Sequence, residues 1–227
     1  MHARTTVVVD PGGRLATVAC QPPLTVRQIR SRAADACALC VVGTAAGPLP
    51  GDDLALSLTL TPSAVASLQA TGAQIAQGGV LGAPTARMRY EVDLGTGATL
   101  DADPGALVVA RNADVEVEVR IDLAADATLT WRETVVLGRS GEPPGRVVLR
   151  WDVRRAGAPL LRQDLDLADP ALRDWPGIHG GAKLLTTTLH VAPGLDARTE
   201  VRAPADVTQR LAHDATLTTT LTPELRR

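Results

Sequence analysis

The chain has 227 residues with a formal net charge of −2, 45% hydrophobic residues and a mean hydropathy of +0.07. This near-neutral charge argues against nucleic acid as the main partner, because phosphate binding needs a concentrated basic face. The composition is typical of a folded globular protein, which we expect to form a single domain over residues 1–227, and no stretch reaches the roughly 20 apolar residues of a membrane span.

The N-terminal segment predicts a β-hairpin rather than a targeting signal. It lacks a charged region followed by an apolar stretch, so we expect a soluble, cytoplasmic protein. Two alternating segments, Thr5–Val9 and Arg14–Cys20, flank the turn sequence Asp-Pro-Gly-Gly at residues 10–13. Such a turn between two alternating segments indicates an antiparallel pair of strands.

Cys37 and Cys40 form a Cys-x-x-Cys motif, and two interpretations of it stay open. One is a redox pair or half of a metal site. The other is a pair of small buried hydrophobic residues, which we favour, because the apolar run that follows predicts a strand. Positions three apart on a strand point to opposite faces, so the two sulfurs would diverge.

The loop Thr44–Asp53 is rich in Gly and Pro and ends in two adjacent aspartates. It lacks the spacing and the Lys-Ser/Thr pair of a phosphate-binding loop. The simpler interpretation is a turn in which aspartate caps the backbone. A functional alternative is that Asp52 faces a polar channel or a partner.

The dominant period of the chain is two, which predicts β-strands. Residues 115–123 alternate strictly between apolar and charged side chains, as expected for a strand with one dry face and one wet face. The pattern Leu-x-x-x-Ala-Thr-Leu recurs at residues 94–100, 123–129 and 211–217. Chance is an alternative in an Ala-rich chain, but the two nearest copies favour a structural repeat of coiled β layers.

Glu133 interrupts the apolar face of the predicted strand Leu129–Leu137. A carboxylate on such a face is costly unless it is paired or lines a wet cavity. We therefore predict that Glu133 is an internal functional carboxylate. A buried Glu–Arg pair and a local bulge that turns the side chain outward are the alternatives.

Arginine supplies almost all of the positive charge, and Lys183 is the single lysine. Arginine is enriched at protein interfaces because its guanidinium pairs bidentately. The segment around Trp131–Arg146 therefore predicts a recognition surface, with an arginine cluster as its main interface candidate: Arg132, Arg139, Arg146 and Arg150.

The region after this segment predicts a second hairpin and little helix. Arg146–Arg155 and Leu160–Leu167 alternate and are joined by a short Gly-containing connection. Asp169–Trp175 has an N-cap Asp followed by Pro, which predicts one or two helical turns. His179 follows in a Gly-rich segment and is expected to be a solvent-facing loop histidine. Val26–Ala38 fits either a helix or a strand, and we favour a strand.

Three blocks of sequence together resemble the UreD (UreH) family of urease accessory proteins. They are Val42–Asp53, Trp131–Arg146 and Gly177–Leu185, in the order and separation typical of that family. The resemblance implies an all-β fold, mostly antiparallel and helically coiled like an irregular β-solenoid, with few short helices. It also implies a cytoplasmic chaperone in metallocentre assembly that is not an enzyme.

The resemblance further implies partners and a cargo. Members of the family bind the urease apoprotein and UreF, which recruits the GTPase UreG, and they assist nickel insertion without holding a cofactor tightly. Within the matching blocks we predict partner contacts from Trp131, Arg132, Arg139, Arg146 and His179. No nucleic acid or membrane partner is expected.

Three functional hypotheses follow. The leading one is a nickel conduit in which Glu133 and Asp52 bind the ion transiently, because weak oxygen ligands release an ion that nitrogen or sulfur cages would trap. The second is a β-solenoid interaction module with no metal role. The third is an enzyme of unknown type, or a thiol redox protein that uses Cys37 and Cys40, although no catalytic triad or nucleophile elbow supports an enzymatic function.

Overall fold

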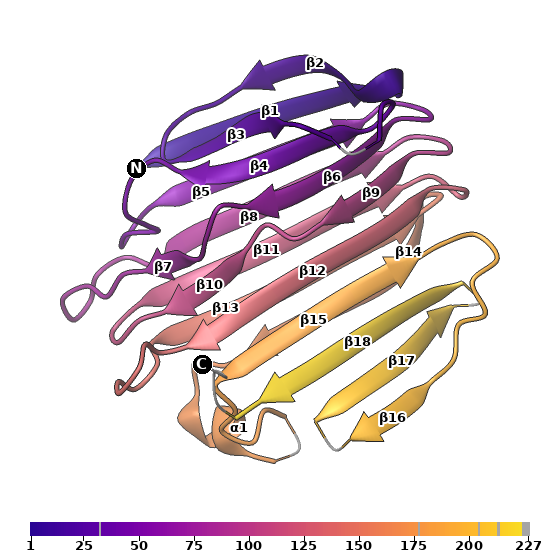
Figure 1. Ribbon diagram of the computed structural model, residues 1–227. Coiled ribbons are helices and arrows are strands. Elements are labelled where there is room, and N and C mark those ends of the chain that lie inside the picture. Colours follow the sequence, from indigo (N-terminus) through magenta and orange to yellow (C-terminus); the bar gives the residue numbers. More distant parts are fainter. Residues whose placement is uncertain (32, 177, 204, 213, 224–227) are drawn as a thin grey trace.

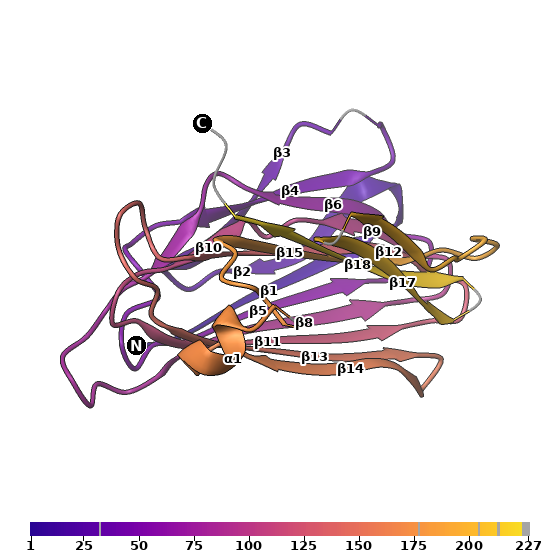
Figure 2. The ribbon, with the colours of Figure 1, turned by 90° about the horizontal axis from the view of Figure 1, so that it is seen from below.

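The computed structural model describes residues 1–31, 33–176, 178–203, 205–212 and 214–223. The chain forms two β-sheets that lie face to face, with the hydrophobic core between them (Figures 1 and 2). The prediction of an all-β, coiled fold is confirmed. Helical structure in the described residues is short: the 3-10 turn Pro11–Gly13 and the helix α1, Pro170–Asp174.

Sheet 1 contains, in spatial order, β14 (Ala158–Asp166), β13 (Arg146–Arg155), β11 (Asp114–Leu123), β8 (Ala86–Leu94), β5 (Asp53–Leu60), β1 (His2–Asp10) and β2 (Arg14–Ala19). Sheet 2 contains β16 (Glu200–Ala203), β17 (Asp206–Ala212), β18 (Ala215–Thr222), β15 (Leu184–Val191), β12 (Thr128–Leu137), β9 (Thr99–Ala102), β6 (Val65–Ala70), β4 (Cys37–Gly43) and β3 (Leu24–Ile29). Two short strands complete sheet 2: β10 (Ala106–Val109) pairs with β12, and β7 (Gln74–Ala76) pairs with β10.

The chain passes repeatedly from one sheet to the other and so winds a coil. From β5 it crosses to β6 and β7, returns to β8, crosses to β9 and β10, and continues through β11, β12 and β13. Successive coils run in the same direction, so their strands pair in parallel, as β5, β8, β11 and β13 do. This corrects the expectation of a mostly antiparallel sheet: antiparallel pairs lie in the hairpins and extensions that flank the coil.

The recurring Leu-x-x-x-Ala-Thr-Leu pattern marks the corners of this coil. At two successive corners the alanine N–H donates to the carbonyl three residues earlier, Ala98 to Gly95 and Ala127 to Ala124. Both alanines are fully buried on the inner side of the turn. The corners also stack, with Thr128 N donating to Ala98 O at 2.8 Å. The structural repeat is therefore confirmed for these two copies.

The third copy, at residues 211–217, has a different role. It joins β17 to β18 within sheet 2 as an antiparallel hairpin, and His213 lies outside the described residues. The hairpins predicted around residues 10–13 and 156–159 are confirmed as β1–β2 and β13–β14. The strand interpretation of residues 26–38 is confirmed only at the two ends of the segment: residues 26–29 belong to β3 and residues 37–38 to β4, and the described residues between them form a connection. Asp169 caps α1 by accepting a hydrogen bond from Ala171 N at 2.8 Å.

The two ends of the coil differ. One end holds the tight corners, and the other end, at the left in Figure 1, holds longer loops. We call the second the loop end; it consists of residues 44–52, 77–85, 110–113, 138–145 and the described part of 167–183. Backbone hydrogen bonds join these loops to one another, such as Gly51 N to Pro84 O at 2.9 Å and Gly79 N to Asn112 O at 3.3 Å.

Candidate functional site

Glu133 lies on the inner face of β12, as its sequence parity predicts. The side chain is buried, with the residue 9% exposed, and its neighbours on the same face of the strand, Trp131 and Val135, are also buried. Neither alternative fits the described residues: none of their ion pairs involves Glu133, and β12 continues in regular register with β15. Instead the Trp151 indole N–H of sheet 1 donates to Glu133 Oε2 at 2.9 Å, which joins the two sheets through the core.

A small cavity of about 20 Å³ lies beside the Glu133 carboxyl group. It lies beside the connection between two strands of sheet 2: β9 ends at Ala102, β10 begins at Ala106, and Pro104 and Gly105 between them line the space. A cavity of this size has room for one water-sized group. Within the described residues, Glu133 Oε1 and Trp131 Nε1 have no hydrogen-bond partner, and both residues line this cavity.

The electrostatics of this cavity favour a carboxyl group that exchanges its proton near neutral pH. Burial raises the pKa of Glu133 to about 7, because a charge is poorly solvated in the core, while the Trp151 hydrogen bond opposes the rise. Burial also raises the pKa of the neighbouring Tyr90 phenol. Glu133 is thus a buried carboxyl group with a raised pKa, and its Oε1 has no hydrogen-bond partner among the described residues.

Asp52 lies at the loop end and is already engaged in two contacts. Its Oδ1 accepts from the Met1 amino group at 2.8 Å, and its Oδ2 accepts from Leu49 N at 2.9 Å. The second contact closes the turn before β5, as the capping interpretation expected. Asp52 and Glu133 are not in contact, and in the described part of the chain no three His, Cys, Asp or Glu side chains gather into a metal-binding group.

The three sequence blocks that carry the family resemblance all reach the loop end. Leu137 N donates to Lys183 O at 2.8 Å, which connects the second block to the third. The Lys183 ammonium in turn donates to Leu137 O at 2.9 Å and Glu142 O at 3.2 Å. The first block supplies the turn that Asp52 closes. Segments far apart in sequence therefore build one continuous surface.

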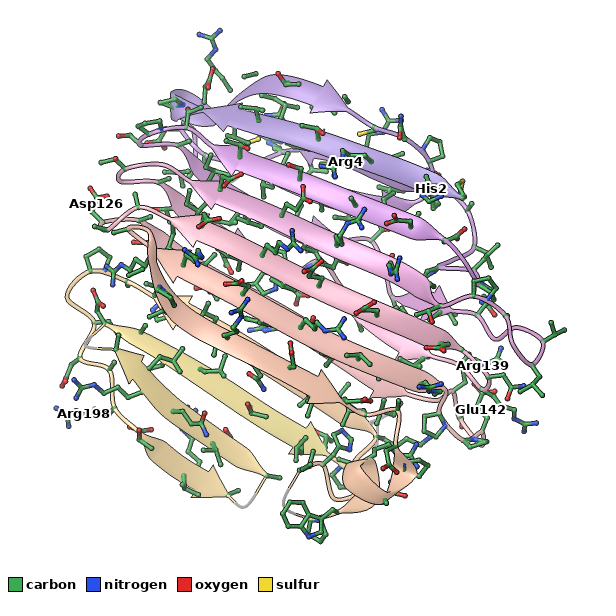
Figure 3. All side chains as sticks on the ribbon, turned by 180° about the vertical axis from the view of Figure 1, so that it is seen from behind. His2, Arg4, Asp126, Arg139, Glu142 and Arg198 are labelled. Atoms are coloured by element: carbon green, nitrogen blue, oxygen red, sulfur yellow. The ribbon has the colours of Figure 1, made fainter. Side chains whose placement is uncertain are left out.

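Arg139 and Arg146 lie on this surface with exposed guanidinium groups. Figure 3 shows Arg139 and Glu142 together at this end, with Asp126 at the opposite end of the coil. Glu142 accepts from Arg139 Nε at 2.8 Å and from Nη2 at 3.0 Å, which lowers the pKa of Glu142 to about 2. The carboxylate thereby fixes the direction of the Arg139 side chain.

The predicted arginine cluster does not gather in one place. Arg132 points outward from sheet 2 and pairs with Asp103 at 3.5 Å, whereas Arg150 points outward from sheet 1 and pairs with Glu116 and, at 3.9 Å, with Asp164. The reason is geometric: β12 and β13 are consecutive in sequence but belong to opposite sheets. Only Arg139 and Arg146 share the loop end.

Two predicted partner-contact residues are buried, which corrects their assignment to the surface. Trp131 is 1% exposed and packs edge to face against Tyr90, with ring centroids 5.5 Å apart. His179 is 2% exposed, so it is not a solvent-facing loop histidine, and burial lowers its pKa. The Gly-rich composition around His179 suggested an open loop, but the chain folds back there, with Ala182 N donating to His179 O.

The cysteine pair is placed as the structural interpretation expected. Cys37 and Cys40 both lie on β4 as free, buried thiols, and burial raises the pKa of the Cys37 thiol. Cys37 packs in the main hydrophobic core, whereas Cys40 points to the other side of the strand. A raised thiol pKa and diverging side chains do not suit redox chemistry.

Sequence reasoning overlooked one exposed feature of the loop end. Val80 and Leu81 are 84% and 106% exposed, at the tip of a loop bounded by glycines. Their only sequence signal was two adjacent aliphatic residues between Gly-Gly and Gly-Ala-Pro.

Comparisons with known proteins agree on one family. A family model described as UreD urease accessory protein matches residues 2–225. The chain is 39% identical over 155 residues to urease accessory protein UreD 1 of Streptomyces griseus, which covers 67% of this chain and 59% of that protein. It is 34% identical over 238 aligned positions to UreD 3 of the same organism, covering 100% of this chain and 92% of the relative.

A third relative is urease accessory protein UreD 1 of Saccharopolyspora erythraea. It is 37% identical over 169 residues, covering 73% of this chain and 66% of the relative. Two of these three matches thus span less than two thirds of the relative's length. No helix among the described residues is long and apolar enough to cross a bilayer.

Proposed function

The chain belongs to the UreD family of urease accessory proteins, and we propose that it is a non-catalytic scaffold that assists nickel insertion into urease. In this proposal it binds the urease apoprotein together with UreF and the GTPase UreG in the cytoplasm. Its relatives are named urease accessory proteins, which supports a role in urease maturation. The loop end, built from all three matching blocks, offers a surface for such partners, with Arg139 and Arg146 at that end and Arg132 on the outer face of sheet 2.

The observation that carries the nickel part of the proposal is the free oxygen of Glu133. A buried carboxyl group with a pKa of about 7 is partly protonated at cytoplasmic pH, so a cation competes with a proton for it. One free oxygen beside a small cavity provides weak, transient coordination. Such coordination suits an ion in transit, because Ni²⁺ held by one carboxylate exchanges readily.

Asp52 is the second candidate ligand in this proposal. Both of its oxygens already accept hydrogen bonds, from the Met1 amino group and from Leu49 N. Nickel binding at Asp52 would therefore have to replace one of these contacts. We accordingly expect substitution of Asp52 to affect the loop end as well as nickel transfer, which makes Glu133 the cleaner test.

The first prediction concerns Glu133→Gln. Glutamine has nearly the same shape and its amide oxygen still accepts the Trp151 hydrogen bond, but it carries no negative charge. We expect urease activated in the presence of this variant to contain several-fold less nickel than with the wild type, measured by metal analysis of the purified enzyme. The amount of the chain that co-purifies with the urease apoprotein should not change.

A matched control is Trp151→Phe, which removes the indole donor but keeps the carboxyl group. It should retain nickel loading provided that it folds, which thermal unfolding checks. Full nickel loading with Glu133→Gln would contradict the conduit and favour the alternative of an interaction module without a metal role. That alternative draws on the lack of any group of three metal-ligating side chains within the described residues.

A further inference from the structure

An open groove of about 480 Å³ crosses the loop end. It runs over successive loops of the coil and is lined by, among others, Pro50, Val80, Leu81, Pro84, Pro144 and Arg146. Its floor therefore comes from segments of the chain that lie far apart in sequence. A groove of this kind forms only when the coil is complete.

The rim of the groove holds two aliphatic side chains out in water. Val80 and Leu81 are almost fully exposed, yet their loop is held in a defined shape. Ala83 N donates to Val80 O at 3.0 Å, and Gly79 leaves no room for a side chain, because a Cβ there would lie 2.8 Å from Pro50 Cγ. A single exposed aliphatic residue is common on protein surfaces and needs no explanation. Two adjacent ones on an ordered loop beside a groove indicate a binding surface.

The charges around the groove are arranged asymmetrically. The carboxylates of Glu142 and Asp52 already accept hydrogen bonds from backbone N–H groups. Leu49 N donates to Asp52 Oδ2 at 2.9 Å within one loop, and Arg111 N donates to Glu142 Oε1 at 3.2 Å from a neighbouring loop. The guanidinium group of Arg146, in contrast, is 66% exposed, and its ion pair with Asp114 is loose at 3.7 Å. Asp114 and Arg173 also line the groove, and Arg173 is paired with Asp174 at 2.8 Å. The exposed Arg146 guanidinium is therefore the charged group of the groove best placed for a new contact.

We propose that this groove binds a segment of the urease apoprotein that presents an aliphatic side chain next to a carboxylate. The aliphatic side chain would pack against Val80 and Leu81, and the carboxylate would pair with Arg146. Arginine suits this because it forms bidentate bonds with carboxylates. The choice of urease as the source of the segment depends on the proposed function; the chemistry of the segment depends only on the groove.

The test measures binding of the purified full-length chain to immobilised urease apoprotein. Two variants change the groove: the double substitution Val80→Ser with Leu81→Ser, and the charge reversal Arg146→Glu. Two matched controls change equally exposed residues elsewhere: Val201→Ser on β16, where the residue is 70% exposed, and Arg162→Glu on the outer face of sheet 1, where the side chain is 81% exposed. Thermal unfolding verifies that all four variants fold.

We expect each groove variant to bind at least tenfold more weakly than the wild type and each control to bind within about twofold of it. Higher salt should weaken the wild type but have much less effect on Arg146→Glu. If the wild type binds and the groove variants bind equally well, the groove is not the site and the proposed function is untouched. If the wild type itself fails to bind urease apoprotein, both proposals are wrong.

Discussion

Glu133 shows how one residue connects the fold to the proposed function. Its carboxyl group accepts a hydrogen bond from Trp151 on the facing sheet and keeps its second oxygen free beside a small cavity. An aliphatic residue of similar size would pack there without the cost of burying a charge. The carboxyl group therefore destabilises the core at high pH, which gives the protein a measurable pH dependence.

The second prediction is that folding stability falls as pH rises between 4.5 and 7. The folded state keeps the Glu133 proton up to about pH 7, whereas the unfolded chain loses it near 4.5. Between these values the folded state binds more protons, so stability decreases with rising pH, by about 3 kcal/mol in total for a shift of this size. Glu133→Gln, which mimics the protonated form, should remove this decrease and be more stable than the wild type at pH 8.

Urea unfolding of the wild type and Glu133→Gln across this pH range measures the effect. The difference between the two proteins is the informative quantity, because other groups that titrate contribute equally to both. Parallel stability profiles would contradict the buried, proton-binding state of Glu133.

The sequence predicts residue environments well on strands and poorly in loops. The period of two placed Glu133 on the inner face, and the structure agrees. The prediction of a solvent-facing His179 is wrong, because the composition of a loop does not tell which other segments pack over it. Trp131 is a predicted partner contact because it lies in a block that carries the family resemblance, but its side chain is buried on the inner face of β12. Sequence pattern therefore predicts which side chains are buried only within a regular element such as a strand.

At the scale of elements, the corners of the coil are encoded by short, small-residue turns. The buried alanine of each corner and its hydrogen bond three residues back recur at Ala98 and Ala127. Strand positions could be predicted from such signals, but the direction of pairing could not. Pairing in parallel depends on which coil lies beside which, and that is set by contacts between residues some 30 positions apart, as in Val92 beside Ile121.

The third prediction concerns the close approach of two loops at the loop end. A Cβ added at Gly145 would lie 2.4 Å from Ala113 O and 2.6 Å from Ala110 O, both backbone atoms. We expect Gly145→Ala to destabilise the protein by about 1–3 kcal/mol in urea unfolding, because the two loops must separate. Gly72→Ala is the matched control, since a Cβ there meets no atom within 4 Å. Equal stability of the two variants would show that the loops are not packed as described.

At the scale of the whole molecule, the central strands of the sheets are paired on both sides and buried, whereas the edge strands are paired on one side and exposed. Strand β11 pairs along its length with β8 and β13 and turns every second side chain into the core. Strand β16 has β17 as its neighbour, and all four of its residues are exposed. The loop end depends on the central coils, whereas the C-terminal strands extend sheet 2 beyond them (Figure 1).

The last prediction follows from this gradient. Amides of β8 and β11 should exchange with deuterium most slowly, because opening them breaks pairs on both sides and exposes buried valine and isoleucine side chains. Amides of β16 should exchange fastest among the strands, and those of the edge strand β2 should follow. Hydrogen exchange read by mass spectrometry on the full chain tests this order. Protection of β16 equal to that of β11 would mean that the C-terminal strands fold as one cooperative unit with the coil, and then variants in them would alter the distant loop end too.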